Sequence, residues 1–150
     1  MVTKVWWAER MEFSLPIRVY IEDTDAGGIV YYVNYLKFIE RARTEFMRSL
    51  GFDKTVIFSE NLMFVVRDVN MQYLLPACLD EELTATAKVR NLGGSFMEID
   101  QRIMREDVCV CTGRVKIVCV DRISLKPRRM PAMMRDTVKS IMADEIEGER

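Results

Sequence analysis

One helical run followed by a long series of strand-like runs is the feature that most limits how this chain can fold. From residue 34 to residue 50, apolar side chains recur at helical spacing and fall on one broad face at about 100° per residue. Asn34 is the expected N-cap, and Gly51 is the expected C′ residue. This run predicts one long helix with a single face in a core.

Strand patterns surround that helix. The first expected strand covers residues 11–21, and residues 82–89 alternate regularly between polar and apolar side chains. Further strands are expected over 62–73, 95–104 and 108–120, and helical pieces over 53–60 and 133–146. Short turns join most of these strands, as is typical of antiparallel pairs. The order predicts an α+β fold in which a five-stranded antiparallel sheet curls around one long central helix.

Composition limits the size and the environment of the protein. The chain has 150 residues, of which 49% are hydrophobic, and this is enough for one core, so we expect a single domain over residues 1–150 with residues 1–10 as a flexible lead-in. With 22 basic and 23 acidic side chains, the net charge of −1 gives no long-range attraction for nucleic acid or an anionic membrane. No apolar run approaches the roughly 18 residues of a membrane-spanning helix. We expect a cytoplasmic protein that neither binds nucleic acid nor inserts into a membrane.

Histidine is missing from the sequence, which excludes Ser-His-Asp and Cys-His catalysis and any imidazole base. Acid–base chemistry is therefore left to a carboxylate, a tyrosine, a lysine or water. The four cysteines include no Cys-x-x-Cys pair, so we expect structural thiols and no metal site.

The segment from Asp23 to Tyr31 carries the strongest functional signal. It places two carboxylates in a glycine-broken turn just before the predicted helix, where backbone N–H groups without helical partners can bind a developing oxyanion. The alternative is an ordinary tight turn, since Asp and Gly are common turn residues. A calcium loop is disfavoured because Gly27 stands at the fifth position, and Asn34 stands at the twelfth, where a bidentate Glu is needed.

With these residues in view, the sequence resembles the hot-dog fold acyl-CoA thioesterases of the 4-hydroxybenzoyl-CoA thioesterase type. It is most similar to the small bacterial members associated with the Tol-Pal system. The matching residues are 18–31, 35 and 40–45, with weaker echoes at 64–67, 73–77, 79–80 and 126–128. The resemblance covers nearly the whole chain and favours the functional interpretation of the Asp25 loop.

The resemblance implies an acyl-CoA thioesterase that acts on a short-chain aliphatic or aromatic acyl-CoA. Asp25 would be the nucleophile or the general base, and the backbone amide of Tyr32 would polarise the thioester carbonyl. Gly27, Gly28 and Tyr31 would contact the substrate, while Asp23 would brace the loop. Coenzyme A is part of the substrate, and no separate cofactor is implied.

Two departures from the family pattern affect what can be predicted about the acyl group and the coenzyme A contacts. Tol-Pal-associated members commonly have His where this chain has Tyr32, whereas the hydroxybenzoyl type has Tyr, so the acyl preference stays open. Some relatives also carry basic residues in the hairpin that corresponds to residues 92–94, and this chain does not. Lys126, Arg128 and Arg129 are then the expected partners of the coenzyme A phosphates, although a solvated surface is the alternative.

The resemblance also implies assembly. A five-stranded sheet wrapped around one helix leaves its edges open, and relatives pair two subunits into one sheet with active sites at the boundary. We expect a homodimer or a dimer of dimers, that is a homotetramer, in which the partner contributes part of each site, from residues 61–67 and the strands that follow. The alternative function is a non-catalytic acyl-thioester-binding or scaffold protein that docks to acyl carrier protein or to lipid-synthesis enzymes.

Overall fold

The computed structural model describes residues 12–149, so the expected lead-in over residues 1–10 lies outside the described residues. The strands are β1 (Phe13–Arg18), β2 (Leu62–Tyr73), β3 (Glu82–Leu92), β4 (Phe96–Arg105) and β5 (Val108–Asp121). The helices are the short 3₁₀ turn η1 (Ile21–Asp23), α2 (Asn34–Ser49), α3 (Lys54–Ser59) and α4 (Ala132–Glu149). The expected order of one strand, one long helix and four further strands is confirmed.

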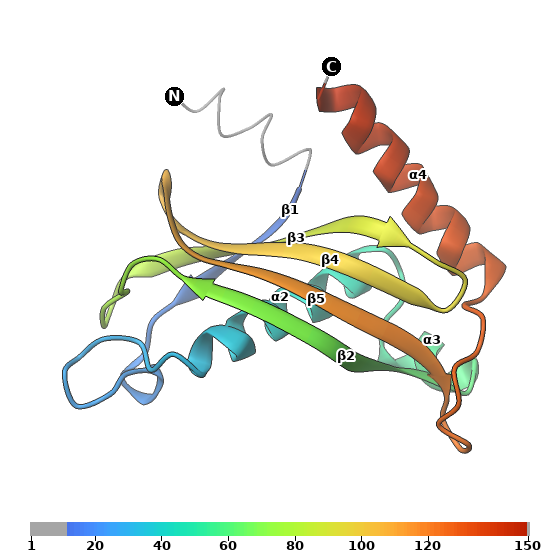
Figure 1. Ribbon diagram of the computed structural model, residues 1–150, viewed down its shortest axis with the longest axis horizontal. Coiled ribbons are helices and arrows are strands. Elements are labelled where there is room, and N and C mark those ends of the chain that lie inside the picture. Colours follow the sequence, from blue (N-terminus) through green and yellow to red (C-terminus); the bar gives the residue numbers. More distant parts are fainter. Residues whose placement is uncertain (1–11, 150) are drawn as a thin grey trace.

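The five strands form one antiparallel sheet in the order β1-β3-β4-β5-β2 (Figure 1). Tight turns join β3 to β4 and β4 to β5, as expected. The strands β1 and β2 form the two edges, although both precede the inner strands in sequence. The predicted fold, a five-stranded antiparallel sheet with one long helix against it, is therefore confirmed.

Helix α2 lies along one face of the sheet, where it buries its apolar side chains against β1, β3 and β4 (Figure 1). The buried residues of its apolar face are Tyr35, Phe38, Ile39, Ala42, Phe46 and Met47. Gly51 follows the C-cap Leu50 with a φ of 88°, as predicted for the C′ residue. Burying this face stabilises the helix far more than its intrinsic propensity does.

Polar side chains inside this core fix the position of α2 relative to the sheet. Gln101, which is 1% exposed, donates from Nε2 to the carbonyl oxygen of Ile39 at 2.8 Å. Its Oε1 accepts a hydrogen bond from Nη1 of Arg43 at 3.0 Å. Burial lowers the pKa of the Arg43 guanidinium. Because a buried amide is costly unless it is bonded, these contacts favour one position of α2 over others.

Strand β2 is a long open edge. Among the strands that the structure describes it pairs only with β5, and Val66 and Val69 are 49% and 41% exposed on it. The open side of an edge strand of this length offers a row of free N–H and C=O groups to another chain. At the other side of the molecule, α4 packs against β3. No helix in the described part of the chain is long and apolar enough to cross a membrane.

Candidate active site

The loop between β1 and α2 is held on both sides by backbone hydrogen bonds. The amide of Asp25 donates to the carbonyl of Ile29 at 2.9 Å, and the amide of Gly28 donates to the carbonyl of Asp25 at 3.1 Å. Gly28 has a φ of 79°, a conformation that other residues rarely adopt. Val30 donates to the carbonyl of Ala77 at 2.8 Å, which fastens the loop to the segment that follows β2.

Asp25 lies at the exposed tip of this loop. Its Oδ1 accepts a hydrogen bond from the amide of Gly27 at 2.8 Å, which is the only hydrogen bond of this carboxylate within residues 12–149. A Cβ on Gly27 would lie 3.3 Å from that same oxygen, so a side chain there would crowd the carboxylate. Asp25 thus keeps one oxygen, Oδ2, available for chemistry.

Asp23 is buried and structural, as expected for a residue that braces the loop. It is 6% exposed, and its carboxylate accepts hydrogen bonds from the amide of Tyr20 and from Nδ2 of Asn34, each at 2.9 Å. The prediction that Asn34 caps the helix was wrong. The N-cap is Val33, which makes no side-chain cap, and the side chain of Asn34 turns to Asp23 instead.

The backbone at the start of α2 leaves amides without partners. Tyr31, Tyr32 and Val33 each accept a hydrogen bond from the residue three positions later, which tightens the first turn. Within the part of the chain that the structure describes, the N–H of Tyr32 has no acceptor. The carboxylate of Asp25 and a free amide at the positive end of the helix dipole therefore belong to the same loop.

Aromatic rings flank this amide. The rings of Tyr31 and Tyr32 have centroids 5.1 Å apart, and the ring of Tyr32 meets that of Tyr73 edge-on at 5.9 Å. Tyr73 also lies 5.6 Å from the buried ring of Tyr35, whose hydroxyl accepts the amide of Ala77 at 3.2 Å. Burial raises the pKa of Tyr73 and of Tyr35. Sequence reasoning missed Tyr73 because no local pattern links the end of β2 to the start of α2.

The three basic residues expected to meet coenzyme A lie elsewhere. Nη1 of Arg128 donates to the carbonyl of Glu60 at 2.7 Å, and Lys126 is exposed beside it in the chain. The guanidinium of Arg129 lies over Gly94, since a Cβ built there would be 3.1 Å from its Nη1. Arg129 therefore brings a positive charge to the hairpin at residues 92–94, which has none of its own.

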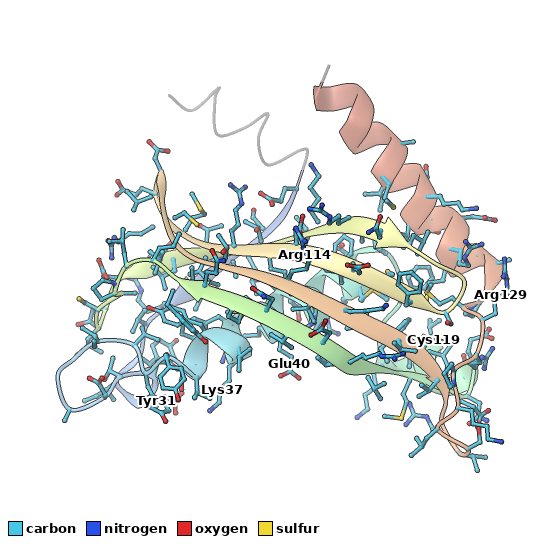
Figure 2. The ribbon with its side chains drawn as sticks, viewed as in Figure 1. Tyr31, Lys37, Glu40, Arg114, Cys119 and Arg129 are labelled. Atoms are coloured by element: carbon cyan, nitrogen blue, oxygen red, sulfur yellow. The ribbon has the colours of Figure 1, made fainter. Side chains whose placement is uncertain are left out.

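These basic residues and the Asp25 loop lie at opposite ends of the sheet. The end of β2 at Tyr73 is beside the loop, whereas its start at Leu62 pairs with Asp121, just before the basic residues. Eleven residue steps of a strand span about 36 Å. Figure 2 shows the same separation, with Tyr31 and Arg129 at opposite ends of the molecule. One chain does not bring the two groups together.

The cysteines are free thiols. Burial raises the pKa of Cys111 to about 12 and that of Cys119 above its ordinary value, while Cys78 is exposed next to the loop. Among residues 12–149, no three His, Cys, Asp or Glu side chains group as metal ligands. The predicted absence of a metal stays a prediction.

The fold is that of a known class, and the chain belongs to the thioesterase superfamily, whose family model matches residues 27–112. It is 42% identical over 120 residues to the acyl-CoA thioesterase YbgC of Haemophilus influenzae, covering 79% of this chain and 88% of that protein. It is 40% identical over 133 residues to the acyl-CoA thioester hydrolase YbgC of Escherichia coli, covering 88% of this chain and 94% of that protein.

A solved structure supports the same assignment. The probable thioesterase from Bartonella henselae superposes with a TM-score of 0.76 at 35% identity, covering 80% of this chain and 99% of that chain. The resemblance stated from the sequence is thus confirmed, and so is the expected enzyme class, an acyl-CoA thioester hydrolase. The roles of individual residues stay predictions.

Proposed function

We propose that hydrolysis takes place at the loop before α2, with Asp25 as nucleophile or general base and the Tyr32 amide as the donor to the thioester oxygen. The observation that carries this proposal is the pairing of two available groups in one loop. Oδ2 of Asp25 and the N–H of Tyr32 both lack a partner among residues 12–149. A donor fixed in advance stabilises the developing oxyanion by about 2.7–4 kcal/mol.

Two courses of the reaction are compatible with this geometry. In the first, Oδ2 of Asp25 adds to the carbonyl carbon, the Tyr32 amide binds the oxyanion, and the C–S bond breaks to release coenzyme A as thiolate. Water then hydrolyses the resulting acyl anhydride of Asp25. In the second, Asp25 takes a proton from a water molecule, and that water adds to the carbonyl carbon directly. Both courses give the free acid and coenzyme A, and neither needs a cofactor.

The neighbouring residues would form the mouth of the site. Gly28 allows the turn through its positive φ, and Gly27 leaves room beside the Asp25 carboxylate. The exposed rings of Tyr31 and Tyr32, with Tyr73 behind them, would pack against a compact acyl group. We propose a short-chain aliphatic or an aromatic acyl group on this basis.

We propose that the complete site needs a second copy of the chain. The Asp25 loop is open to solvent, and the basic residues proposed to bind the coenzyme A phosphates lie at the other end of β2, a strand that spans about 36 Å. If two β2 edges pair antiparallel about a two-fold axis, the Leu62 end of one copy comes next to the Tyr73 end of the other. Lys126, Arg128 and Arg129 of one copy would then serve the Asp25 loop of its partner.

A cavity supports the same arrangement. It measures about 430 Å³ and lies between α2, α3 and the first half of β2. Its apolar lining includes Met47, Phe52, Ile57, Met63, Phe64 and Ile117. Because it lies at the Leu62 end, a partner's Asp25 loop would face it, and an acyl chain would enter it there. We propose a homodimer as the minimal active form and a dimer of dimers as the full assembly.

The setting of the reaction follows from the same chemistry. All four cysteines are free thiols, as is usual in a reducing compartment, and this supports a cytoplasmic enzyme. Acyl carrier protein presents the same kind of thioester as acyl-CoA, so we propose it as a further partner. The association with the Tol-Pal system stays a prediction.

The test is hydrolysis of a panel of aliphatic and aromatic acyl-CoAs, followed by release of free thiol. We expect steady-state release with at least one class and faster release with compact acyl groups. Calorimetry on the same panel provides the second measurement. Binding of acyl-CoA without any thiol release would favour the non-catalytic alternative, in which the protein holds a thioester for another enzyme.

A further inference from the structure

A buried pair of polar side chains lies directly behind the proposed site. Asp23 and Asn34 are 6% and 7% exposed, and Nδ2 of Asn34 donates to Oδ1 of Asp23 at 2.9 Å. A buried carboxylate is costly unless it is hydrogen-bonded, and removing its partner leaves that cost uncompensated. The pair therefore has a large influence on the loop around it.

The pair joins three parts of the chain. Oδ2 of Asp23 accepts the amide of Tyr20 at 2.9 Å, on the side where the loop begins. The carbonyl oxygen of Asp23 accepts the amide of Tyr31 at 2.9 Å, on the side where the loop ends. Asn34 belongs to α2, so its side chain ties both sides of the loop to the first turn of the helix.

The two proposed reacting groups are the immediate neighbours of these anchors. Asp25 follows Asp23 by two residues, and Tyr32 follows Tyr31 directly. Asn at the start of a helix ordinarily caps it, but here Val33 is the N-cap and the Asn34 amide is used on Asp23. Its neutral amide supports the carboxylate without adding a charge next to Asp25.

We propose that Asn34 is a positioning residue for thioester hydrolysis. Acting through Asp23, it sets the position of the Asp25 carboxylate relative to the Tyr32 amide. This inference rests on the function proposed above for those two groups. Misplacing a reacting group by about 1 Å can reduce a rate by about 100-fold. The effect falls on kcat, because the side chain of Asn34 bonds to Asp23 and not to the basic residues proposed to bind coenzyme A.

The first variant is Asn34→Ala, measured in the intact protein on its best acyl-CoA substrate. We expect kcat to fall by about 100-fold, with KM within about threefold of the wild-type value. The matched control is Asn91→Ala, which removes an exposed Asn whose Nδ2 lies 3.5 Å from Oε1 of Glu98. This control is expected to leave kcat and KM unchanged. A wild-type kcat in folded Asn34→Ala would overturn the inference.

A rescue experiment separates positioning from general stabilisation. Asn34→Asp places two carboxylates against each other and is expected to be at least as damaging as Asn34→Ala. Combining it with Asp23→Asn restores a donor and an acceptor with their roles exchanged. We expect this double variant to regain at least about tenfold in kcat over Asn34→Asp alone. No regain in a folded double variant would contradict the proposal.

Hydrogen exchange covers the case in which Asn34→Ala folds poorly. In the milder Asn34→Ser variant, the Tyr31 amide, which donates to Asp23, is expected to exchange faster while amides within α2 keep their protection. Unchanged protection of Tyr31 would overturn the inference. Failure of the proposed function has a different signature, since wild-type protein would then release no thiol from any acyl-CoA.

Discussion

Two turns at opposite ends of the sheet are each built on an aspartate, and they use its carboxylate differently. Oδ1 of Asp121 accepts the amides of Ile123 at 2.9 Å and Ser124 at 2.7 Å. Within the described part of the chain, the Oδ1 of Asp25 accepts only the amide of Gly27. Backbone hydrogen bonds from Ser124 and then Ile123 hold the pKa of Asp121 below its ordinary value. The Asp121 carboxylate accepts two backbone amides and stabilises a turn, whereas the Asp25 carboxylate accepts one and shares its loop with a free helix amide.

The same two turns differ in how they adopt a left-handed backbone. Gly28 has the positive φ in the Asp25 loop, where glycine accepts it without strain. Leu125 has a φ of 62° in the other turn, where a bulky side chain makes the conformation costly. An Asp in a tight turn is therefore no evidence of chemistry by itself. The number of backbone amides that its carboxylate accepts, and the groups in the same loop, distinguish the two roles.

Removing the charge from each aspartate tests this comparison most strongly. Asp25→Asn keeps the size of the side chain but abolishes its nucleophilic and basic character, so we expect kcat to fall by about a thousandfold or more. Asp121→Asn, the matched control, is expected to keep kcat within about twofold of wild type. Steady-state thiol release measures both. Near-normal turnover by well-folded Asp25→Asn would remove the distinction between the turns.

The second prediction concerns the proposed pairing of two β2 edges, which would bring the Asp25 loop of one copy next to the opposite end of its partner's sheet. Val66→Lys combined with Val69→Lys puts two charges on the open edge of β2 and is expected to prevent pairing with another copy. We expect a monomer that has lost about 100-fold or more in kcat/KM although Asp25 is intact. Light scattering measures the oligomeric state and thiol release measures the activity, both on the same sample.

The control for the edge is Val108→Lys, which alters an exposed valine on β5, an inner strand. It is expected to leave assembly and activity unchanged. If the β2 variant is a fully active monomer, the Asp25 loop needs no residue from the opposite end of a partner's sheet, and the proposed dimer site is wrong.

The third prediction tests whether the backbone amide of Tyr32 or its phenol acts together with Asp25. Tyr32→Phe removes the phenol but keeps the backbone amide, so we expect turnover to stay within about threefold of wild type. The measurement is kcat and KM on the substrate that the panel selects. A severe loss of kcat with unchanged KM would assign the side chain a role that the amide-only mechanism lacks.

The smallest expected effect is the change in thermal stability when the Asp121 carboxylate is removed from its turn. The folded pKa of Asp121 is lowered, so its contribution is present above the unfolded pKa of about 3.9 and is lost as the pH falls through the folded pKa. Asp121→Asn is expected to lower Tm at pH 7 by about 2 °C. The difference from wild type should vanish near pH 2. Thermal unfolding at both pH values is the measurement, and a pH-independent difference would contradict it.

The sequence predicted the elements well because their patterns are local. The strand predicted over residues 62–73 has those bounds, and the helix predicted from Asn34 ends one residue early, at Ser49. The first strand is shorter than residues 11–21, because the chain turns into η1 after Val19 has hydrogen-bonded to Glu81. Boundaries fail where a contact with a distant segment decides them.

The candidate site was predicted in part. The glycines and carboxylates of the Asp25 loop lie in one stretch of sequence, so their pattern was visible there. The burial of Asp23 against Asn34 was not, because the usual local use of Asn at a helix start predicted a cap. The contact of Tyr73 with Tyr32 depends on the register of β2, and no single-sequence pattern specifies that.

The order of strands in the sheet also determines when this protein can finish folding as it is made. Each edge strand leaves the ribosome before its partner, since β1 waits for β3 and β2 waits for β5. The Asp25 loop receives its hydrogen bond from Val30 to Ala77 only after β2 has been synthesised. Nascent chains therefore expose both sides of β2 until β5 emerges, and an unpaired strand is prone to wrong pairing between chains during this period.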